Sequence, residues 1–414
     1  MTGQRAAAEP YTTRWETTVE WVDGDEIGLD VTYFYAESGG QPADRGTIGD
    51  ATVTDVQRVD GETVHTVADA SGVATGDRLI CTVDWAFRTY CMRAHTASHA
   101  LYGVAREHLD DLGYGGFDIG APTVEDIGTV GDAKVRVDLR TSTTVDDDVL
   151  VDLEAGVNRV VWESRPVSWN SVPAEEARSR GEVAFNTKTE EGVMSSADSV
   201  RLVTIGGPTD EAPPLDVAAC GGTHVRNTRQ IGPVTVLERS NPGEGLTRVE
   251  FAVGPPGVRR RATEKRALFD AARALDAAPS ETADAARDLR ARVEDLAATV
   301  TDLRGDLVAA ELAAAEATER EGRPWIGATV DGVGPNDVRE TVLGAVGDAA
   351  DVVVLAGTDG ATFVVAGSTG DPPAEDVVAD LTDRFGGGGG GSERFAQGGG
   401  LDATPAEVVA HLRE

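Results

Sequence analysis

Apolar positions in the first 90 residues come in short runs separated by turn-forming residues. Val, Ile, Thr and aromatic side chains are common within the runs, and Gly, Asp and Pro lie between them. This pattern is typical of strands joined by tight turns, and it favours a small β-barrel or sandwich. We assign residues 1–90 to a barrel domain. The runs are Thr17–Val22, Ile27–Phe34, Ala51–Val56, Thr63–Val67 and Leu79–Val83.

The periodicity changes after residue 90. Apolar and small residues at three- to four-residue spacings predict a helix over residues 91–113. Strand-like and helix-like runs then follow one another, which predicts an α+β domain over residues 91–256. Strands are expected at residues 135–139, 232–238 and 248–253, and helices at residues 146–163 and 174–180.

Leu and Val recur at three- to four-residue spacings between residues 258 and 320, in a background of Ala, Glu, Arg and Asp. The pattern predicts an antiparallel helical hairpin over residues 257–322, with its turn near residues 277–281. This composition favours a spacer or a self-association element over a catalytic one. A homodimer formed through the hairpin or through the C-terminal domain is therefore one expectation.

Residues 323–414 predict a separate C-terminal α/β domain. Asp351–Ala356 and Thr362–Ala366 are nearly continuous apolar runs, as expected of buried strands. Helices are predicted at residues 374–384 and 405–413. Between them lie six consecutive glycines, Gly386–Gly391, which we predict to form a loop that lets the backbone approach phosphate or another backbone closely.

The net charge of the chain bears on which ligands the protein can bind. The 414 residues carry a net charge of −34, which on its own argues against a nucleic-acid partner. The chain has very few lysines, and its acidic residues are spread over every segment. That combination predicts adaptation to high salt, so the net charge says little about the ligand. We expect a cytoplasmic protein, because no apolar run is long enough for a membrane helix and the N-terminus lacks an apolar signal core.

Two pentapeptides hold four of the nine His and Cys residues of the chain. His95-Thr-Ala-Ser-His99 places two imidazoles one helical turn apart. Cys220-Gly-Gly-Thr-His224 adds a thiol and a third imidazole, and Gly221 and Gly222 free the backbone to turn both side chains inward. Together they predict one tetrahedral zinc site with His95, His99, Cys220 and His224 as ligands.

Cys91 is a rival ligand, because it lies one turn before His95 on the same helical stripe. Cys91 and His99 are separated by about 12 Å of helix rise, so they cannot both bind one ion. Either Cys91 with His95, or His95 with His99, is the binding pair. A second choice also stays open: four protein ligands are typical of a structural zinc, whereas hydrolysis needs an exchangeable position.

The two pentapeptides resemble the metal motifs in the editing domain of alanyl-tRNA synthetase and in its free-standing relatives, the AlaX proteins. Leu29–Gly46 is similar to that family's glycine-rich motif, and Asp84–His95 to the lead into its first metal motif. The strands around Asn227–Gly232 and Arg248–Phe251 resemble those after the second motif. The hairpin and Phe385–Gly400 resemble the synthetase's C-terminal domain, so the resemblance covers nearly the whole chain and matches the long AlaX form.

The resemblance implies zinc-dependent hydrolysis of Ser-tRNA(Ala), and also of Gly-tRNA(Ala), with no aminoacylation core upstream of the glycine-rich motif. Such a protein acts in trans, on tRNA charged elsewhere. Thr32 matches the family's threonine that contacts the seryl hydroxyl, and Ser98 replaces the usual threonine before the second histidine. The expected substrate-binding residues are Thr32, Gly39, Gly40, Gln41, Ser98, Gly221 and Gly222.

The family's C-terminal glycine segment usually carries a basic residue that touches tRNA, and here that segment is bare glycine. Arg384, Gly388, Arg394 and Gln397 are the expected tRNA-binding residues. Residues 113–131 contain an insertion in which the family's polar pocket residue has no counterpart. Two other functions stay open. One is a non-catalytic tRNA-binding protein with a structural zinc, and the other is a metalloprotease, which the missing glutamate of His-Glu-x-x-His disfavours.

Overall fold

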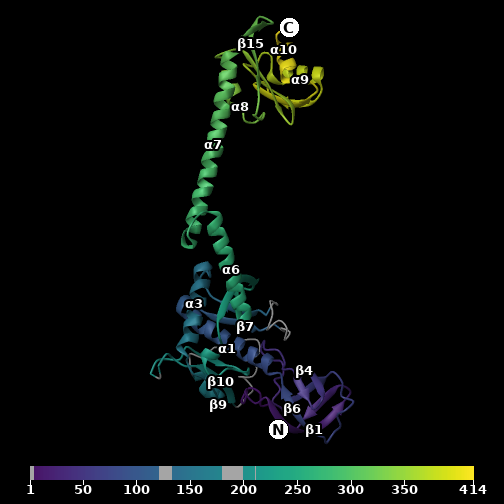
Figure 1. Ribbon diagram of the computed structural model, residues 1–414, viewed down its shortest axis with the longest axis vertical. Coiled ribbons are helices and arrows are strands. Elements are labelled where there is room, and N and C mark those ends of the chain that lie inside the picture. Colours follow the sequence, from purple (N-terminus) through teal and green to yellow (C-terminus); the bar gives the residue numbers. More distant parts are fainter. Residues whose placement is uncertain (1–3, 121–132, 180–198, 210) are drawn as a thin grey trace. The chain divides into compact units, whose positions relative to one another are not determined.

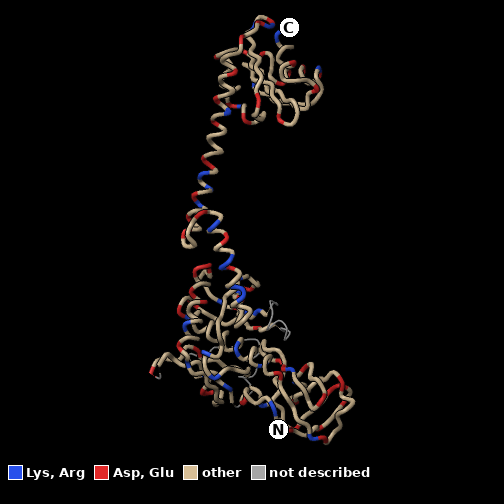
Figure 2. The backbone as a smooth tube through the Cα atoms, in the orientation of Figure 1, with Lys and Arg blue, Asp and Glu red and all other residues tan. Residues whose placement is uncertain are grey.

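The computed structural model describes residues 4–120, 133–179, 199–209 and 211–414 (Figure 1). The fold is a mixture of helices and sheets, and the chain divides into two compact units, Met1–Phe269 and Asp270–Glu414. Asp and Glu are spread along both units (Figure 2). Within the described ranges, no helix is both long and apolar enough to cross a membrane.

The first unit begins with a closed six-stranded barrel, as the sequence predicted. The strands are joined antiparallel in the order β1-β2-β5-β4-β3-β6. Along β4, buried Ala51 and Val53 alternate with exposed Thr52 and Thr54, which is the period-two pattern of a strand with one buried face. The strands are β1 (Arg14–Asp23), β2 (Glu26–Leu29), β3 (Gly46–Ile48), β4 (Ala51–Val59), β5 (Glu62–Val67) and β6 (Arg78–Val83).

Two strand predictions in the barrel were wrong. β2 ends at Leu29, and the residues from Asp30 to Phe34 leave the sheet to enter the glycine-rich segment. β3 was missed because it has only three residues and directly follows that segment. The rest of the glycine-rich segment forms a loop closed by paired backbone hydrogen bonds between Ser38 and Gln41.

Helix α1 (Trp85–His108) passes through the core of the first unit and carries the first metal motif. It begins earlier than predicted because the Asp84 side chain accepts a hydrogen bond from the Phe87 amide and caps it. It ends before Leu109, whose backbone is extended.

Two small sheets complete the first unit. One has the order β12-β13-β8-β7 and the other β11-β10-β9. Helix α3 (Asp147–Glu163) packs on α1 and on β12. Among the described residues, the strands are β7 (Gly113–Asp118), β8 (Val135–Arg140), β9 (Val167–Pro173), β10 (Ser199–Ile205), β11 (Asp216–Ala219), β12 (Val234–Gly243) and β13 (Leu246–Val253), and the short helices are α4 (Ala174–Ser179) and η1 (Thr228–Gln230).

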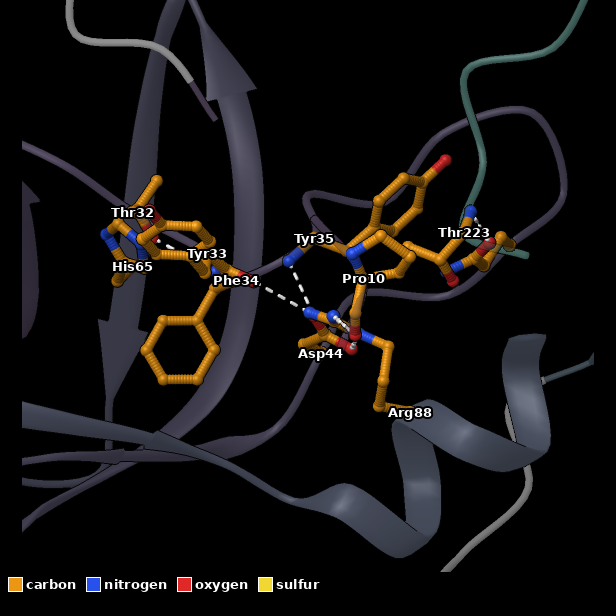
Figure 3. Close-up of polar contacts among 10 residues, drawn as sticks. Pro10, Thr32, Tyr33, Phe34, Tyr35, Asp44, His65, Arg88 and Thr223 are labelled. Carbon is orange, nitrogen blue, oxygen red and sulfur yellow. Dashed lines mark hydrogen bonds and ion pairs between the residues drawn. The ribbon is translucent and has the colours of Figure 1, made fainter. Parts of the chain in front are cut away.

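A buried ion pair joins the barrel to α1 (Figure 3). The Arg88 guanidinium, fully buried, is bonded through Nε and Nη2 to the carboxylate of Asp44. It also donates to the backbone carbonyls of Pro10 and Tyr33, at 2.8 and 2.7 Å. The same carboxylate accepts from the Tyr35 amide at 2.6 Å, so both ends of the glycine-rich loop are fixed to the helix.

The second unit is a six-stranded sheet with helices on both faces. Its order is β14-β15-β16-β17-β19-β18, and the β15–β16 pair is parallel whereas the other pairs are antiparallel. Along β16, Val352 and Val354 pack toward α9 and α10, whereas Val353 and Leu355 pack toward α8 and the end of α7. The strands are β14 (Thr318–Arg320), β15 (Arg323–Val330), β16 (Val352–Asp359), β17 (Ala361–Ser368), β18 (Gly388–Gly391) and β19 (Phe395–Leu401); the helices are α7 (Thr282–Ala314), α8 (Arg339–Ala345), α9 (Ala374–Phe385) and α10 (Pro405–Leu412).

The predicted glycine loop was wrong in part, because Gly388–Gly391 form the edge strand β18. This strand pairs antiparallel with β19. A Cβ atom on Gly389 would overlap the backbone of β19 and the Val378 side chain on α9, and one on Gly391 would overlap Ala396. Glycine therefore lets the strand and its neighbours approach each other closely. The prediction allowed an approach either to phosphate or to another backbone, and the structure shows the second.

Two helices, α6 (Pro255–Ala274) and α7, flank the predicted turn, which includes the short helix η2 (Pro279–Glu281). The division between the two compact units falls within α6. Near the end of α7, Val308 and Leu312 are buried against the C-terminal sheet. The apolar residues earlier in α7 are exposed: Leu289, Val293, Leu296, Val300, Leu303 and Leu307, which we call the α7 stripe.

The barrel contains a buried histidine that should make its stability depend on pH. His65 Nδ1 lies 3.0 Å from the Ile27 carbonyl, which can only accept, so Nδ1 carries the proton and Nε2 accepts from the Thr32 hydroxyl at 2.8 Å (Figure 3). Burial lowers the pKa of His65 to about 4, from an ordinary value of 6.5. The unfolded chain then binds this proton more readily than the folded one, so stability falls as the pH drops from 6.5 toward 4.

We expect this histidine to account for a loss of about 3 kcal/mol of unfolding free energy across that window. Denaturant unfolding at several pH values measures it, with His65→Gln as the test variant. His108→Gln is the control, because His108 is exposed on α1. Equal pH dependence in the wild type and His65→Gln would show that His65 is not the group responsible.

Candidate metal centre

The structure brings the four predicted ligands together. His95 and His99 lie one turn apart on α1, and Cys220 and His224 follow β11 directly. One nitrogen or sulfur atom from each residue lies within 4.8 Å of the other three. Cys220 Sγ is 3.3 Å from His95 Nε2 and 3.2 Å from His224 Nε2. This group could hold one metal ion.

Each histidine of the cluster uses Nδ1 for a hydrogen bond outside it. His95 Nδ1 lies 3.0 Å from Gln41 Oε1, His99 Nδ1 lies 2.8 Å from Asp216 Oδ2, and His224 Nδ1 lies 3.2 Å from Thr96 Oγ1. Amide and carboxylate oxygens only accept, so the first two Nδ1 atoms carry protons. Metal-binding histidines usually have such an outer partner, which orients the ring and fixes its tautomer.

Thr96 imposes the same tautomer on the third histidine. Its hydroxyl donates its one hydrogen to the Met92 carbonyl at 2.8 Å, as helical threonines often do. Toward His224 it can therefore only accept, so His224 Nδ1 is the donor. In their neutral forms all three imidazoles then present an unprotonated Nε2 to the cluster, which is the form that binds metals.

The electrostatics of the cluster favour a thiolate. Burial raises the pKa of the Cys220 thiol, but His95 and His224 outweigh burial and hold it well below its usual range. Burial also lowers the pKa of His99, but hydrogen bonds to Asp216 and Cys220 outweigh this and raise it to about 10. Burial and the neighbouring His95 depress the pKa of His224. A thiolate is the metal-binding form of cysteine.

Two glycines are required by close packing around the cluster. A Cβ atom on Gly222 would overlap the His95 ring, so only glycine lets the second motif lie against the first. Gly40 has a φ of +83°, and a Cβ there would overlap the Phe117 carbonyl of β7. Its own carbonyl accepts from the Ile119 amide at 2.9 Å, which joins the glycine-rich loop to the second sheet.

Gln41 connects three segments of the chain. Its Oε1 accepts from the Thr223 amide at 3.0 Å as well as lying against His95, and its Nε2 donates to the Thr223 hydroxyl at 2.9 Å. The residue is fully buried. The structure thus places Gln41, an expected substrate residue, as a support of the two metal motifs.

The other expected substrate residues have different surroundings. Ser98 is buried and donates to the His95 carbonyl at 2.7 Å. Thr32 lies in the barrel, where it bonds His65 and accepts from the Phe34 amide, which leaves one lone pair for a further hydrogen bond. Gly39 and Gly221 have open space where a Cβ would point.

The cluster resolves the choice between the two ligand pairs. His95 and His99 belong to it, whereas Cys91 lies in the hydrophobic core. Burial raises the pKa of Cys91, which keeps it a neutral thiol. In the described part of the chain, no other group of His, Cys, Asp and Glu converges in this way.

Three residues at the cluster were not found from the sequence. Asp216 orients His99, Thr96 orients His224, and the Phe117 ring stacks on His95 with centroids 4.6 Å apart. The signal for Thr96 was its position inside the first motif. Asp216 is the one charged residue in the apolar run before Cys220, and this could have identified it from the sequence as a candidate site residue. Phe117 carried no signal, and residues 121–132 of the predicted insertion lie outside the described residues.

The expected tRNA-binding residues lie on α9 and along the β18–β19 edge of the second unit. Arg384 is in the last turn of α9, Gly388 lies on β18, Arg394 lies between the two strands, and Gln397 lies on β19, where it pairs with Gly390. All four are exposed.

Comparison with known proteins fits this arrangement. Residues 200–250, which include the second metal motif, match the model of the threonyl and alanyl tRNA synthetase second additional domain. Residues 7–87 match the model of class II (A) tRNA synthetases.

Individual relatives extend the similarity along the chain. The alanine–tRNA ligase of Natronomonas pharaonis is 32% identical over 98% of this chain, and that of Frankia alni is 34% identical over 94%. The chain spans 44% of the length of each. The crystallised C-Ala domain of Aquifex aeolicus alanyl-tRNA synthetase is 25% identical, covering 24% of this chain and 95% of that one, with a TM-score of 0.22, which is too low to support a fold argument.

The sequence comparisons therefore place the chain in the tRNA synthetase-related class. More closely, it is related to alanyl-tRNA synthetase over nearly its whole length.

The donor set of the cluster fits zinc, because three imidazole nitrogens and one thiolate suit its tetrahedral preference. Gln41→Ala should lower zinc affinity about 10- to 100-fold, since it removes the partner that orients His95. Competition of the apoprotein with a chromogenic chelator measures this. Gln57→Ala on the barrel is the control, because Gln57 contacts only Asp55 and Glu37 through its side chain. Unchanged zinc affinity in Gln41→Ala would contradict this assignment.

Proposed function

We propose that this protein is a zinc-dependent deacylase that removes serine, and also glycine, from mischarged tRNA(Ala). The carrying observation is the convergence of three imidazole nitrogens and one thiolate in a segment similar to the second additional domain of alanyl and threonyl tRNA synthetases. Similarity to alanine–tRNA ligases over nearly the whole chain supports tRNA(Ala) as the RNA partner.

Such a deacylase compensates for a physical limit on how well a synthetase can select its amino acid. A site that activates alanine discriminates only weakly against a side chain with one more hydroxyl or one fewer methyl, because each difference amounts to about 1–3 kcal/mol. Hydrolysis of the wrong ester at a second site restores accuracy. Thr32 is the proposed contact for the seryl hydroxyl, since its remaining lone pair can accept one hydrogen bond.

Zinc held by His95, His99, Cys220 and His224 would supply a positive charge that polarises an ester carbonyl or promotes ionisation of water. The protein's own groups orient the reactants. Asp216 and Gln41 fix the rings of His99 and His95. Exposed Gly221 leaves open space beside Cys220, where the aminoacyl ester can approach the backbone. We place the aminoacyl group there.

One observation favours a second function. Four protein ligands would complete a tetrahedral coordination shell, as in structural zinc sites, and His224 is fully buried. The alternative is a non-catalytic tRNA-binding protein whose zinc stabilises the fold. His99 weighs against this alternative, because its side chain is 10% exposed at the edge of the cluster.

Deacylation of Ser-tRNA(Ala) in concentrated potassium chloride tests the proposal. We expect zinc-loaded protein to release serine at least about 100-fold faster than buffer, and to leave Ala-tRNA(Ala) intact. His99→Ala should lose this activity and bind zinc more weakly. His108→Ala, on the same helix but outside the cluster, is the matched control.

Two outcomes would overturn parts of this proposal. If zinc-loaded wild type leaves the seryl ester as stable as in buffer yet binds tRNA(Ala), the non-catalytic alternative holds. If Cys220→Ala unfolds the first unit, as circular dichroism would show, the zinc has a structural role.

We also propose that the protein self-associates through the α7 stripe. The six residues follow alternating four- and three-residue spacings, with Leu289, Leu296 and Leu303 at one heptad position and Val293, Val300 and Leu307 at the other. Each is 45–64% exposed. β-Branched residues at one position and Leu at the other favour a two-stranded coiled coil. A second copy of α7 therefore fits this stripe.

Sedimentation equilibrium tests the self-association. Wild type should have twice the monomer mass, and Leu296→Glu should be monomeric, because a charge at a core heptad position opposes pairing. Ala298→Glu is the matched control, since Ala298 is exposed two residues away and outside the stripe. A monomeric wild type, or equal dissociation of both variants, would exclude the coiled coil.

A further inference from the structure

The first unit contains a cavity of about 670 Å³ that the metal cluster does not use. It lies between the N-terminal segment, the start of α1, the chain that follows His224 and the start of α6. Its volume is in the range of small-molecule binding sites. The residues that line the cavity determine which kind of ligand it can bind.

The charge of the walls is opposite to that of the protein. Arg93, Arg229 and Arg259 line the cavity, and none of the described residues in its wall is acidic. The whole chain has 71 acidic residues against 37 basic ones. Arg93 and Arg229 are exposed and form no ion pair with any acidic residue of the described ranges. A local positive site in an acidic protein selects an anion.

Aromatic rings give the cavity a second property. Tyr11 and Trp85 lie at its wall with centroids 5.8 Å apart, and Trp85 is 42% exposed. The Tyr11 hydroxyl donates to Gln230 at 2.9 Å and accepts from the Arg226 amide at 3.1 Å. The Arg226 guanidinium stacks on the Tyr11 ring. These contacts hold the Tyr11 ring in place. The Trp85 ring is inclined to it by 51°, and its exposed surface is the one on which a planar base can stack.

The cavity adjoins the metal cluster through a single hydroxyl. Met92 and Val225 belong to its wall. The Thr96 hydroxyl donates to the Met92 carbonyl, accepts from the Val225 amide at 3.2 Å, and contacts His224 Nδ1. The cavity wall is therefore linked by hydrogen bonds to the Nδ1 side of His224.

We propose that this cavity binds an unpaired nucleotide of the RNA substrate, with the base stacked on Trp85 beside Tyr11 and the phosphate held by Arg93 and Arg229. Cations combined with aromatic rings are the common means of holding single-stranded nucleic acid. The inference rests on the proposed function, because it assigns part of the same RNA substrate to a second site. It gives the acidic chain a local surface on which RNA binds.

Equilibrium binding of uncharged RNA tests the cavity without relying on hydrolysis. The probe is a fluorescent acceptor-stem hairpin of tRNA(Ala) with its single-stranded 3′ end, titrated with zinc-loaded full-length protein. Trp85→Ala should weaken binding about tenfold, and Trp85→Phe should restore most of it, because a ring is retained. Trp162→Ala is the control, since Trp162 is 88% exposed on α3.

The arginines are tested by salt dependence. Arg93→Gln with Arg229→Gln should weaken binding and reduce the slope of log K against log salt by about 1–2, as expected for one or two lost phosphate contacts. Arg58→Gln with Arg140→Gln is the charge-matched control, since both residues are exposed in the first unit. A blunt hairpin without the 3′ single strand should bind the wild type and Trp85→Ala equally.

Several results would overturn the inference. They are wild-type affinity in Trp85→Ala, equal weakening in Trp162→Ala, or the same loss with the blunt hairpin. Competition by free adenosine or cytidine monophosphate at micromolar concentration, with no effect of Trp85→Ala on the hairpin, would assign the cavity to a free nucleotide. Because uncharged RNA is used, failure of deacylation leaves this test intact, and normal RNA binding by the cavity variants leaves the deacylase proposal intact.

Discussion

The buried pair between Arg88 and Asp44 is the interaction on which the arrangement of the first unit depends. It fixes the glycine-rich loop to α1, and the loop in turn presents Gln41 to both metal motifs. A buried charge that loses its partner costs about 3–5 kcal/mol, so the two residues act as one unit. The Pro10 carbonyl satisfies another guanidinium hydrogen, which brings the N-terminal segment to the same point. Tyr11, at the cavity wall, follows directly.

The consequence is a cluster whose ring orientations are fixed before any ion binds. Each imidazole has an acceptor at Nδ1, and burial excludes the water that could otherwise replace that acceptor. Gly222 allows the close approach of the second motif to His95. Preorganisation of this kind strengthens metal binding because little side-chain freedom is lost on binding. The same loop positions Gly40 against β7, so the barrel, the helix and the sheet are mutually dependent.

The sequence by itself determined much of this protein. Short apolar-rich runs between turn-forming residues predicted the barrel and most of its strands, because strands joined by tight turns have this pattern. Residue type and spacing identified the four residues that converge in the cluster, since a helical turn and a glycine-rich segment each place two donors together. The heptad spacing of the α7 stripe was also present in the sequence, although not the fact that these side chains are exposed in the structure.

Only the tertiary structure decided the remaining features. Cys91 and His99 are equally placed around His95 on an isolated helix, and the position of Cys220 selects His99. The roles of Asp216 and Gln41 depend on contacts between residues 117 and 182 positions apart in the chain. The glycine run became a strand because β19 supplies its hydrogen-bond partners. In each case the deciding partner is distant in sequence, and local propensity carries no information about which distant group will be buried beside it.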